Sequence, residues 1–314
     1  MSLVPPPKPD GRSEAADAST RAADRARADA GDVLAGPFYV DTHVHIYPAF
    51  DATALLDAAI VNVRRVAPGA THEADALPVL MLTECRDDHA FTRLRDRRTL
   101  GPWRFEPLEP NRPESPALLA VREDDPNRRI ALVAGRQIIT VCRLEVLALG
   151  TDHVFPDGHD LDETIAEVRG RQALPVVPYG FGKWTGKRGA AVSRLIESQS
   201  LQNAPRLVLG DNGGRPTLGP RPPHFDQAAA HRVTILPGTD PLPLRSCRRQ
   251  AGRFGVRVQG PIRRDAFVPE LLDRLANLGP VPPRFGDHVS LPRAIYQQIA
   301  LRLDRKILGG KGRL

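Results

Sequence analysis

The sequence predicts an α/β fold because its expected strands are uninterrupted apolar runs and helical patterns alternate with them. Runs such as 77–84 and 174–178 lack the apolar–polar alternation of a half-exposed strand. Continuous apolar runs are typical of strands buried on both faces of a parallel sheet. The expected strands begin at Phe38 and continue with residues 77–84, 130–133, 137–141, 144–149, 174–178, 206–210, 233–237 and 255–258. The expected helices are residues 51–66, 161–168, 190–196, 244–250, 268–278 and 291–303.

The chain divides into an N-terminal arm and one domain. Residues 1–36 are rich in Pro and then in Ala, Arg and Asp, so we expect a disordered or loosely attached arm. Residues 37–314 are expected to form a single α/β domain, for which the 41% apolar content is sufficient. The Pro- and Arg-rich segment 98–126 is interpreted as an insertion or a long loop.

The composition of the chain limits which partners and which cellular compartment are expected. A formal charge of +7 favours anionic partners. Aromatic residues are only 5% and no basic block is interleaved with them, which argues against nucleic acid as a partner. No apolar run approaches the ~18 residues of a membrane span. The three cysteines are widely spaced without a Cys-x-x-Cys pair, which favours reduced thiols and a cytoplasmic location.

The first strand ends in two histidines spaced two residues apart, His43 and His45. Residues at this spacing point to the same face of a strand, so both imidazoles can bind one metal ion. Asp41 is expected on the same face, as a ligand or as a group that orients an imidazole. The alternative is a chance pair of histidines in a strand that ends at the surface.

Polar and Gly-rich segments follow many of the other strands. Functional groups of α/β proteins gather at the C-terminal ends of parallel strands, so we expect these segments to form one active-site rim. The segments contribute Glu84, His153, Tyr179, Asp211, Asn212, Arg215 and Asp240. Asp240 in particular can complete a metal site that the first strand begins, or it can be a turn aspartate before Pro241.

The segment 180–189 combines four glycines with three cations, Lys183, Lys187 and Arg188. Glycines let backbone amides approach a ligand, and a helix that starts just beyond them adds positive dipole. Because the chain has only five lysines, two in one loop indicate an anion site. The alternative is an exposed loop with solvated cations.

Asp41-Thr42-His43-Val44-His45, together with Gly238-Thr239-Asp240, resembles the PHP (polymerase and histidinol phosphatase) family, with the amidohydrolase superfamily as second choice. The resemblance implies a TIM-like, distorted (β/α)7-8 barrel and a metal-dependent phosphoesterase or amidohydrolase-like activity. Its His-x-His carries over to His43 and His45, and its late aspartate to Asp240. At the other strands this sequence departs from the family pattern, because Cys85, Gln137 and Tyr179 stand where the family has metal ligands. The resemblance therefore implies at most one divalent ion (Zn, Mn or Fe), held by His43, His45, Asp240 and Glu84.

These inferences predict a metal-dependent hydrolase that acts on a phosphorylated or other anionic small molecule through a metal-activated water. Asp240 and Glu84 are the expected catalytic residues. The expected substrate-binding residues are Tyr179, Lys183, Lys187, Arg188, Asp211, Asn212, Arg215 and His153. The alternative is a degenerate PHP-like barrel without catalysis that binds a ligand or acts as a scaffold.

Overall fold

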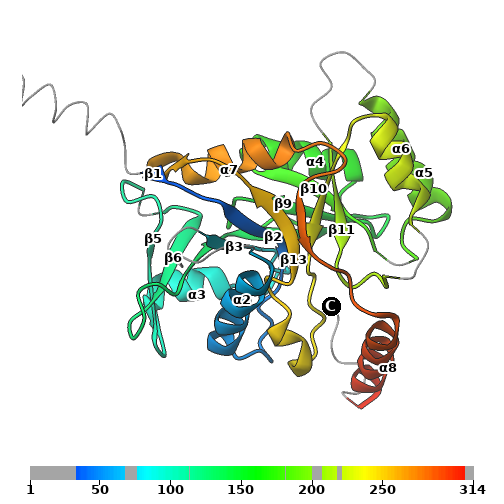
Figure 1. Ribbon diagram of the computed structural model, residues 1–314. Coiled ribbons are helices and arrows are strands. Elements are labelled where there is room, and N and C mark those ends of the chain that lie inside the picture. The colour runs from blue at the N-terminus through cyan, green and yellow to red at the C-terminus, as the bar shows by residue number, and fades with distance from the viewer. Residues whose placement is uncertain are drawn as a thin grey trace, which may run out of the picture.

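The computed structural model describes residues 33–67, 76–112, 114–180, 182–199, 207–217 and 221–307 (Figure 1). These residues form two large sheets and a two-stranded one. The first sheet has the order β15-β13-β2-β3-β7-β6-β5-β4. Its strands are Arg284–Gly286 (β15), Phe254–Val258 (β13), Phe38–Val44 (β2), Leu77–Leu82 (β3), Arg129–Val133 (β7), Ala117–Arg122 (β6), Trp103–Pro107 (β5) and Thr99–Leu100 (β4).

The second sheet has the order β12-β11-β10-β9-β8. Its strands are Thr234–Gly238 (β12), Val208–Asn212 (β11), Leu174–Pro178 (β10), Glu145–Leu149 (β9) and Gly135–Ile139 (β8). The small sheet pairs Val33–Leu34 (β1) with Ile262–Arg263 (β14), so the part of the expected arm that the structure describes is tied to the domain. Residues 1–32 of that arm lie outside the described residues.

The predicted (β/α)7-8 barrel is wrong. A closed barrel needs every strand to share a ladder with a neighbour on both sides, whereas each large sheet here is open and ends in edge strands, β15 and β4 in the first and β12 and β8 in the second. In the described residues, three strands run parallel in each large sheet, β2-β3-β7 and β10-β11-β12. Antiparallel strands lie on both sides of the first run and next to β10 in the second. The segment 98–126 contributes to this, because it contains β4, β5 and β6, which extend the first sheet beyond β7.

The two large sheets nevertheless face one another around a shared apolar interior. Inward residues of both sheets pack together there, among them Val40, Met81, Leu147, Val176 and Leu236. The helix Phe267–Ala276 (α7) adds its apolar side to the same cluster. The sheets touch at two seams. At one, the backbone of Glu84 bonds to β8, and at the other β2 lies beside β12 without a shared ladder in the described chain.

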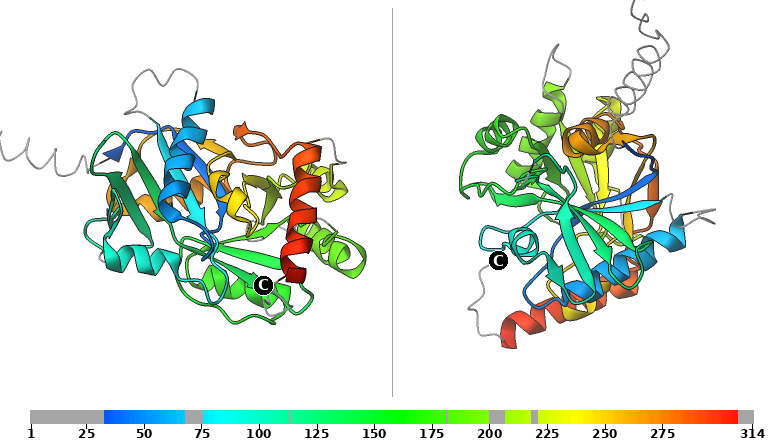
Figure 2. Two further views of the ribbon diagram at one scale, coloured as in Figure 1. Left: turned by 90° about the horizontal axis from the view of Figure 1, so that it is seen from below. Right: turned by 90° about the vertical axis from the view of Figure 1, so that its left-hand side faces the viewer.

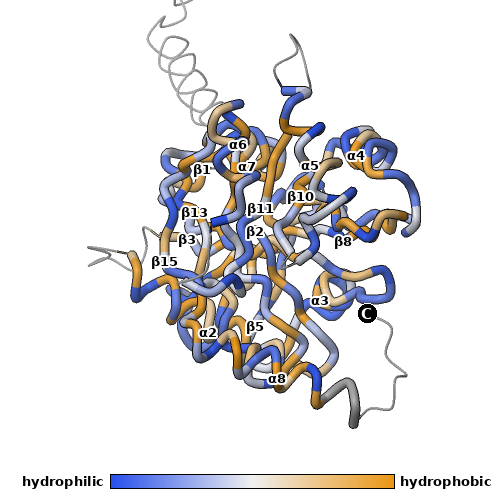
Figure 3. The backbone as a smooth tube through the Cα atoms, turned by 90° about the vertical axis from the view of Figure 1, so that its right-hand side faces the viewer, coloured by the Kyte–Doolittle hydropathy of each residue, from blue (hydrophilic) through white to orange (hydrophobic). Residues whose placement is uncertain are grey.

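Helices cover the outer faces of both sheets (Figures 1 and 2). The first sheet is covered by Ala52–Val66 (α2), Ala90–Arg97 (α3), the 3₁₀ helix Arg245–Arg249 (η1) and Leu291–Ile307 (α8). The second sheet is covered by Leu161–Gly170 (α4), Gly186–Ser198 (α5) and Pro223–Ala230 (α6). A short 3₁₀ turn, Arg264–Ala266 (η2), precedes α7. Figure 3 shows how apolar and polar residues are distributed along this backbone.

The helix α2 shows why these segments form where they do. Asp51 caps its N-terminus, because its side chain accepts hydrogen bonds from the backbone N–H groups of Thr53 and Ala54. The buried residues of α2 recur every three or four positions, which places them on one face against the sheet. They are Leu55, Leu56, Ala59, Ile60 and Val63. In the described part of the chain, no helix is both long and apolar enough to span a membrane.

Candidate metal centre

A bulge near the end of β2 turns the two histidines toward the interior. Asp41 pairs with Leu80 of β3 and Val44 pairs with Leu82, so β2 advances three residues while β3 advances two. Val40 accordingly packs in the interior cluster, whereas Val44 packs against the outer face under α2. Without the bulge these two residues would share a face. The extra residue thus places His43 and His45 between the sheets.

Three possible ligands meet at this point. The Nε2 atoms of His43 and His45 lie 3.2 Å apart. Asp240 Oδ1 lies 3.6 Å from each of them. The two histidine side chains are 5% and 3% exposed and that of Asp240 is 20% exposed, so the group opens to solvent on the aspartate side. In the described residues, His43, His45 and Asp240 form a group that could hold a metal ion.

These separations fit a metal ion. Nitrogen and oxygen ligands at about 2.0–2.2 Å from a tetrahedral zinc ion lie roughly 3.3 Å from one another. The three observed separations of 3.2, 3.6 and 3.6 Å fall close to that value. The donor set, two imidazoles and one carboxylate, also suits divalent zinc, iron or manganese.

Burial keeps both imidazoles neutral. It lowers the pKa of His43 to about 4. Burial, with a further contribution from His43, lowers the pKa of His45 to about 3. A neutral imidazole offers the lone pair that a metal requires. Burial also raises the pKa of Asp240, against the lowering effect of His45 and Asn212, so a cation at the group would favour the charged carboxylate.

Asp240 is held in place by close contacts between β12 and β2. Its backbone N–H donates to His43 O at 2.7 Å, and its φ of +46° turns the chain toward the histidines. Gly238 permits this approach, because a Cβ there would lie 2.6 Å from His43 Cβ and 2.7 Å from His43 N. Asn212, at the end of β11, donates its side-chain N–H to Asp240 Oδ2, which leaves Oδ1 facing the histidines.

Asp41 is not part of the ligand group, but its hydrogen bonds support the segments that carry the ligands. It is fully buried, and its carboxylate accepts from the N–H groups of Thr239 and Gly252, each at 2.8 Å. It also accepts from the Thr239 hydroxyl and, at 3.3 Å, from the N–H of His43. Burial raises its pKa to about 7 against the lowering effect of these bonds. Asp41 therefore links the histidine strand to the residue before Asp240.

Three further side chains border the histidines. Gln137 of β8 forms a side-chain hydrogen bond with His43 and with His45, which partly offsets the lowering of their pKa values by burial. Glu145 of β9 acts on His43 through its charge, and Lys183 acts on both His43 and Asp240. Lys183 Nζ contacts Glu145 Oε1 directly. Sequence reasoning missed Glu145, because nothing near it in sequence marks chemistry and only the β8–β9 hairpin brings it here.

Glu84 lies outside the ligand group and has other partners. Its Oε2 atom is 3.2 Å from Arg136 Nη1, and both side chains are 3% exposed. Its Oε1 atom accepts the N–H of Phe91 at 2.6 Å, in the first turn of α3. The structure therefore places the Glu84 carboxylate in a buried ion pair at the seam between the sheets.

The other predicted substrate-binding residues divide between two places. Asp211 forms an ion pair with Arg215 at 3.0 Å and accepts from His288 Nε2 at 2.9 Å. Burial opposes ionisation of Asp211, but the bonds from His288 and Arg215 outweigh it and lower the pKa. Asp211, Arg215 and His288 thus form a second polar cluster. Burial raises the pKa of Tyr179, and the charges of Arg215 and Asp211 also act on it.

The remaining predicted residues are not gathered around the histidines. Lys187 is exposed, and Arg188 donates to the carbonyl of Gly182 at 3.3 Å. His153 packs its ring edge-on against Phe155. Of the residues predicted to bind substrate, Lys183 and Asn212 are the ones placed beside the histidine–aspartate group.

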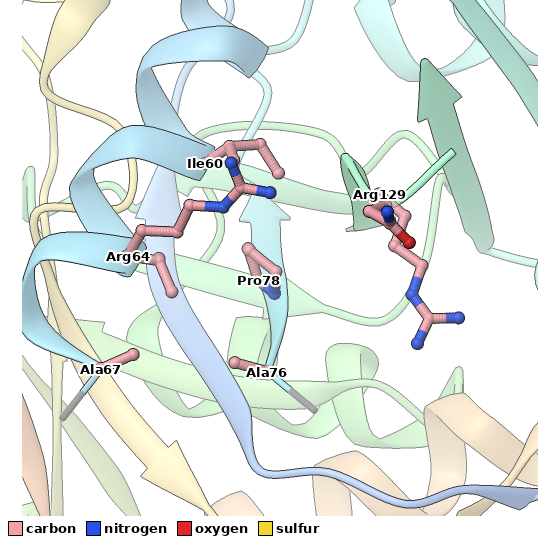
Figure 4. A pocket seen from close by; sticks show the side chains of 8 residues that line it. Ile60, Arg64, Ala67, Ala76, Pro78 and Arg129 are labelled. Carbon is pink, nitrogen blue, oxygen red and sulfur yellow. The ribbon is translucent and has the colours of Figure 1, made fainter. Parts of the chain in front are cut away.

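A pocket of about 250 Å³ lies at the opposite end of the β2–β3 pair from the histidines (Figure 4). It lies between α2 and the beginning of β3, with Arg64 and Arg129 on its walls. It contains none of the predicted site residues.

Comparison with known proteins gives a fold relationship. No family model and no curated protein matches the sequence. PsfC from Pseudomonas syringae PB-5123 has a similar structure, with a TM-score of 0.50 and 14% sequence identity. The match covers 86% of this chain and 98% of PsfC. A likeness at this identity shows a shared arrangement of elements and is silent on function.

Proposed function

We propose that this protein is a PHP-like, metal-dependent hydrolase that acts on a phosphorylated or other anionic small molecule. The observation that carries the proposal is the convergence of His43 Nε2, His45 Nε2 and Asp240 Oδ1 at metal-ligand separations. Three protein ligands leave a coordination position open, which is typical of catalytic rather than structural sites. One zinc, iron or manganese ion is the expected cofactor.

The chain's own residues have distinct tasks in this proposal. A divalent ion in such a site supplies Lewis acidity and lowers the pKa of a water molecule toward ~7. His43 and His45 present neutral lone pairs, and Asn212 fixes the orientation of the Asp240 carboxylate. Lys183 supplies positive charge beside the group, where an anionic substrate and the charge developing in a transition state would need it.

The alternative is a protein that binds a ligand at this site without catalysis. The observation in its favour is Gln137, which places a neutral amide beside both histidines where the family resemblance implies a carboxylate. An amide is neither a strong metal ligand nor a base. Turnover by the metal-loaded protein distinguishes the two functions.

The test is a hydrolysis assay of zinc-, iron- and manganese-loaded protein with p-nitrophenyl phosphate and a panel of phosphomonoesters at pH 7.5. We expect turnover that falls about 100-fold or more in Asp240→Asn, because the variant loses the one charged ligand. Asp162→Ala is a matched control, since Asp162 is exposed on α4. Equal turnover by Asp240→Asn would contradict the role of Asp240, and no turnover with any metal would favour the binding protein.

A further inference from the structure

Lys183, to which a task is assigned above, forms an ion pair with Glu145, to which none is assigned, and the charges of both residues act on His43. Lys183 Nζ contacts Glu145 Oε1, and the two side chains are 39% and 17% exposed. Glu145 carries the second carboxylate whose charge acts on the histidines, beside that of Asp240. Lys183, the cation that would receive an anionic substrate, is thus already paired with an anion of the protein itself, Glu145.

The loop that carries Lys183 is built to direct this side chain inward. Trp184, the next residue, is buried and packs edge-on against Tyr179 at 5.4 Å, which anchors the loop. Gly180 leaves room for the lysine, because a Cβ there would lie 2.6 Å from Lys183 Cδ. Gly182 has a φ of +71°, a conformation that other residues rarely adopt. Gly180 and Gly182 therefore suit the path by which the Lys183 side chain reaches Glu145.

We propose that Glu145 is an internal competitor for Lys183, the cation that receives the anionic group of the substrate, so that an oxyanion such as phosphate binds only by displacing the Glu145 carboxylate. The inference rests on the proposed function for the place of the substrate. An incoming anion must replace the Glu145 carboxylate as the partner of Lys183. The displaced carboxylate stays close to the lysine and repels the incoming anion, about twice as strongly for a dianion as for a monoanion.

The competition predicts effects of opposite sign at the two residues. Removing the cation in Lys183→Gln should weaken the binding of inorganic phosphate about tenfold or more. Removing the competitor in Glu145→Gln should strengthen phosphate binding roughly fivefold and acetate binding less, because the repulsion that is removed scales with the charge of the ligand. A purely structural role for Glu145, as a support that holds Lys183 in position, predicts weaker phosphate binding instead.

Isothermal titration with inorganic phosphate and with acetate at pH 8 measures both effects. The matched controls are Lys187→Gln, an exposed lysine of the same loop, and Glu163→Gln, an exposed glutamate on α4, and neither should change affinity beyond about twofold. Thermal melts establish that each variant is folded. Weaker phosphate binding by Glu145→Gln, or a loss in Lys187→Gln equal to that in Lys183→Gln, would overturn the proposal.

The titrations are repeated on chelator-treated protein and on protein loaded with one equivalent of zinc. The exchange between Lys183 and Glu145 needs no metal, so the two opposite effects should persist after chelation. If zinc does not bind but the opposite effects remain, the proposed hydrolase fails while the competition stands. If zinc binds and the opposite effects are absent, the competition fails while the metal site stands.

Discussion

Replacing Asp41 with alanine should destabilise the folded protein by about 3–5 kcal/mol, since each buried donor left without a partner costs about 1–3 kcal/mol. The carboxylate is fully buried and accepts from three backbone N–H groups and the Thr239 hydroxyl. Alanine cannot accept any of these bonds. The midpoint of urea unfolding, followed by circular dichroism, measures the loss.

The control for Asp41→Ala is Asp162→Ala, which removes an exposed carboxylate from the first turn of α4. That change should cost less than about 1 kcal/mol, the usual contribution of an acidic residue at a helix N-terminus. If the two variants unfold at the same urea concentration, Asp41 does not hold β2 to the segment that carries Asp240.

Replacing Gly238 with alanine should weaken the binding of zinc about 10- to 100-fold, the range typical of changes that disturb the support of metal ligands. A Cβ at this position would lie 2.6–2.7 Å from His43 Cβ and N, closer than atoms can approach. The strand β12 must therefore move away from β2. Asp240, two residues further along, would move with it and separate from the histidines.

Zinc affinity, measured by competition with a chromogenic chelator, reports this displacement directly. Gly170→Ala provides the comparison, because a Cβ at Gly170 meets no atom within 4 Å, so its zinc affinity should match the parent protein. A Gly238→Ala protein that is folded and binds zinc as tightly as the parent would show that the close approach of the two strands does not set the position of Asp240.

Hydrophobic patterning accounts for how well the strands could be predicted. Residues 174–178 were expected as a strand and form β10 with those bounds, and the strands expected at 137–141 and 144–149 correspond to β8 and β9, which pair as a hairpin. Continuous apolar runs identify such strands whatever they pair with. The pattern does not report the pairing partner, which is why the sheets were wrongly expected to close into a barrel.

The missed elements were short and weakly patterned. The segment 98–126 looked like a loop because Pro and Arg interrupt it, yet five- and six-residue strands, β5 and β6, fit between those interruptions. The helices α3 and α6 have eight residues each, so they offer barely two turns of periodicity. The segment 244–250 forms the 3₁₀ helix η1 rather than an α-helix.

The candidate site was predictable where local spacing sufficed. His43 and His45 converge as their two-residue spacing implies, and Asp240 joins them across the β2–β12 seam. Glu84 was indistinguishable from a ligand in sequence, because its partner Arg136 is 52 residues away and only the fold brings them together. Glu145 was missed because only the fold brings its strand, β9, to the loop that carries Lys183.

The most direct test of the central claim is the metal content of the purified protein, measured by elemental mass spectrometry beside a His43→Ala/His45→Ala double variant. The variant should melt cooperatively, which establishes that it is folded. The structure predicts about one zinc, iron or manganese ion per chain, lost in the double variant. Equal metal in both proteins, or none in the parent after reconstitution, would contradict a metal centre at His43, His45 and Asp240.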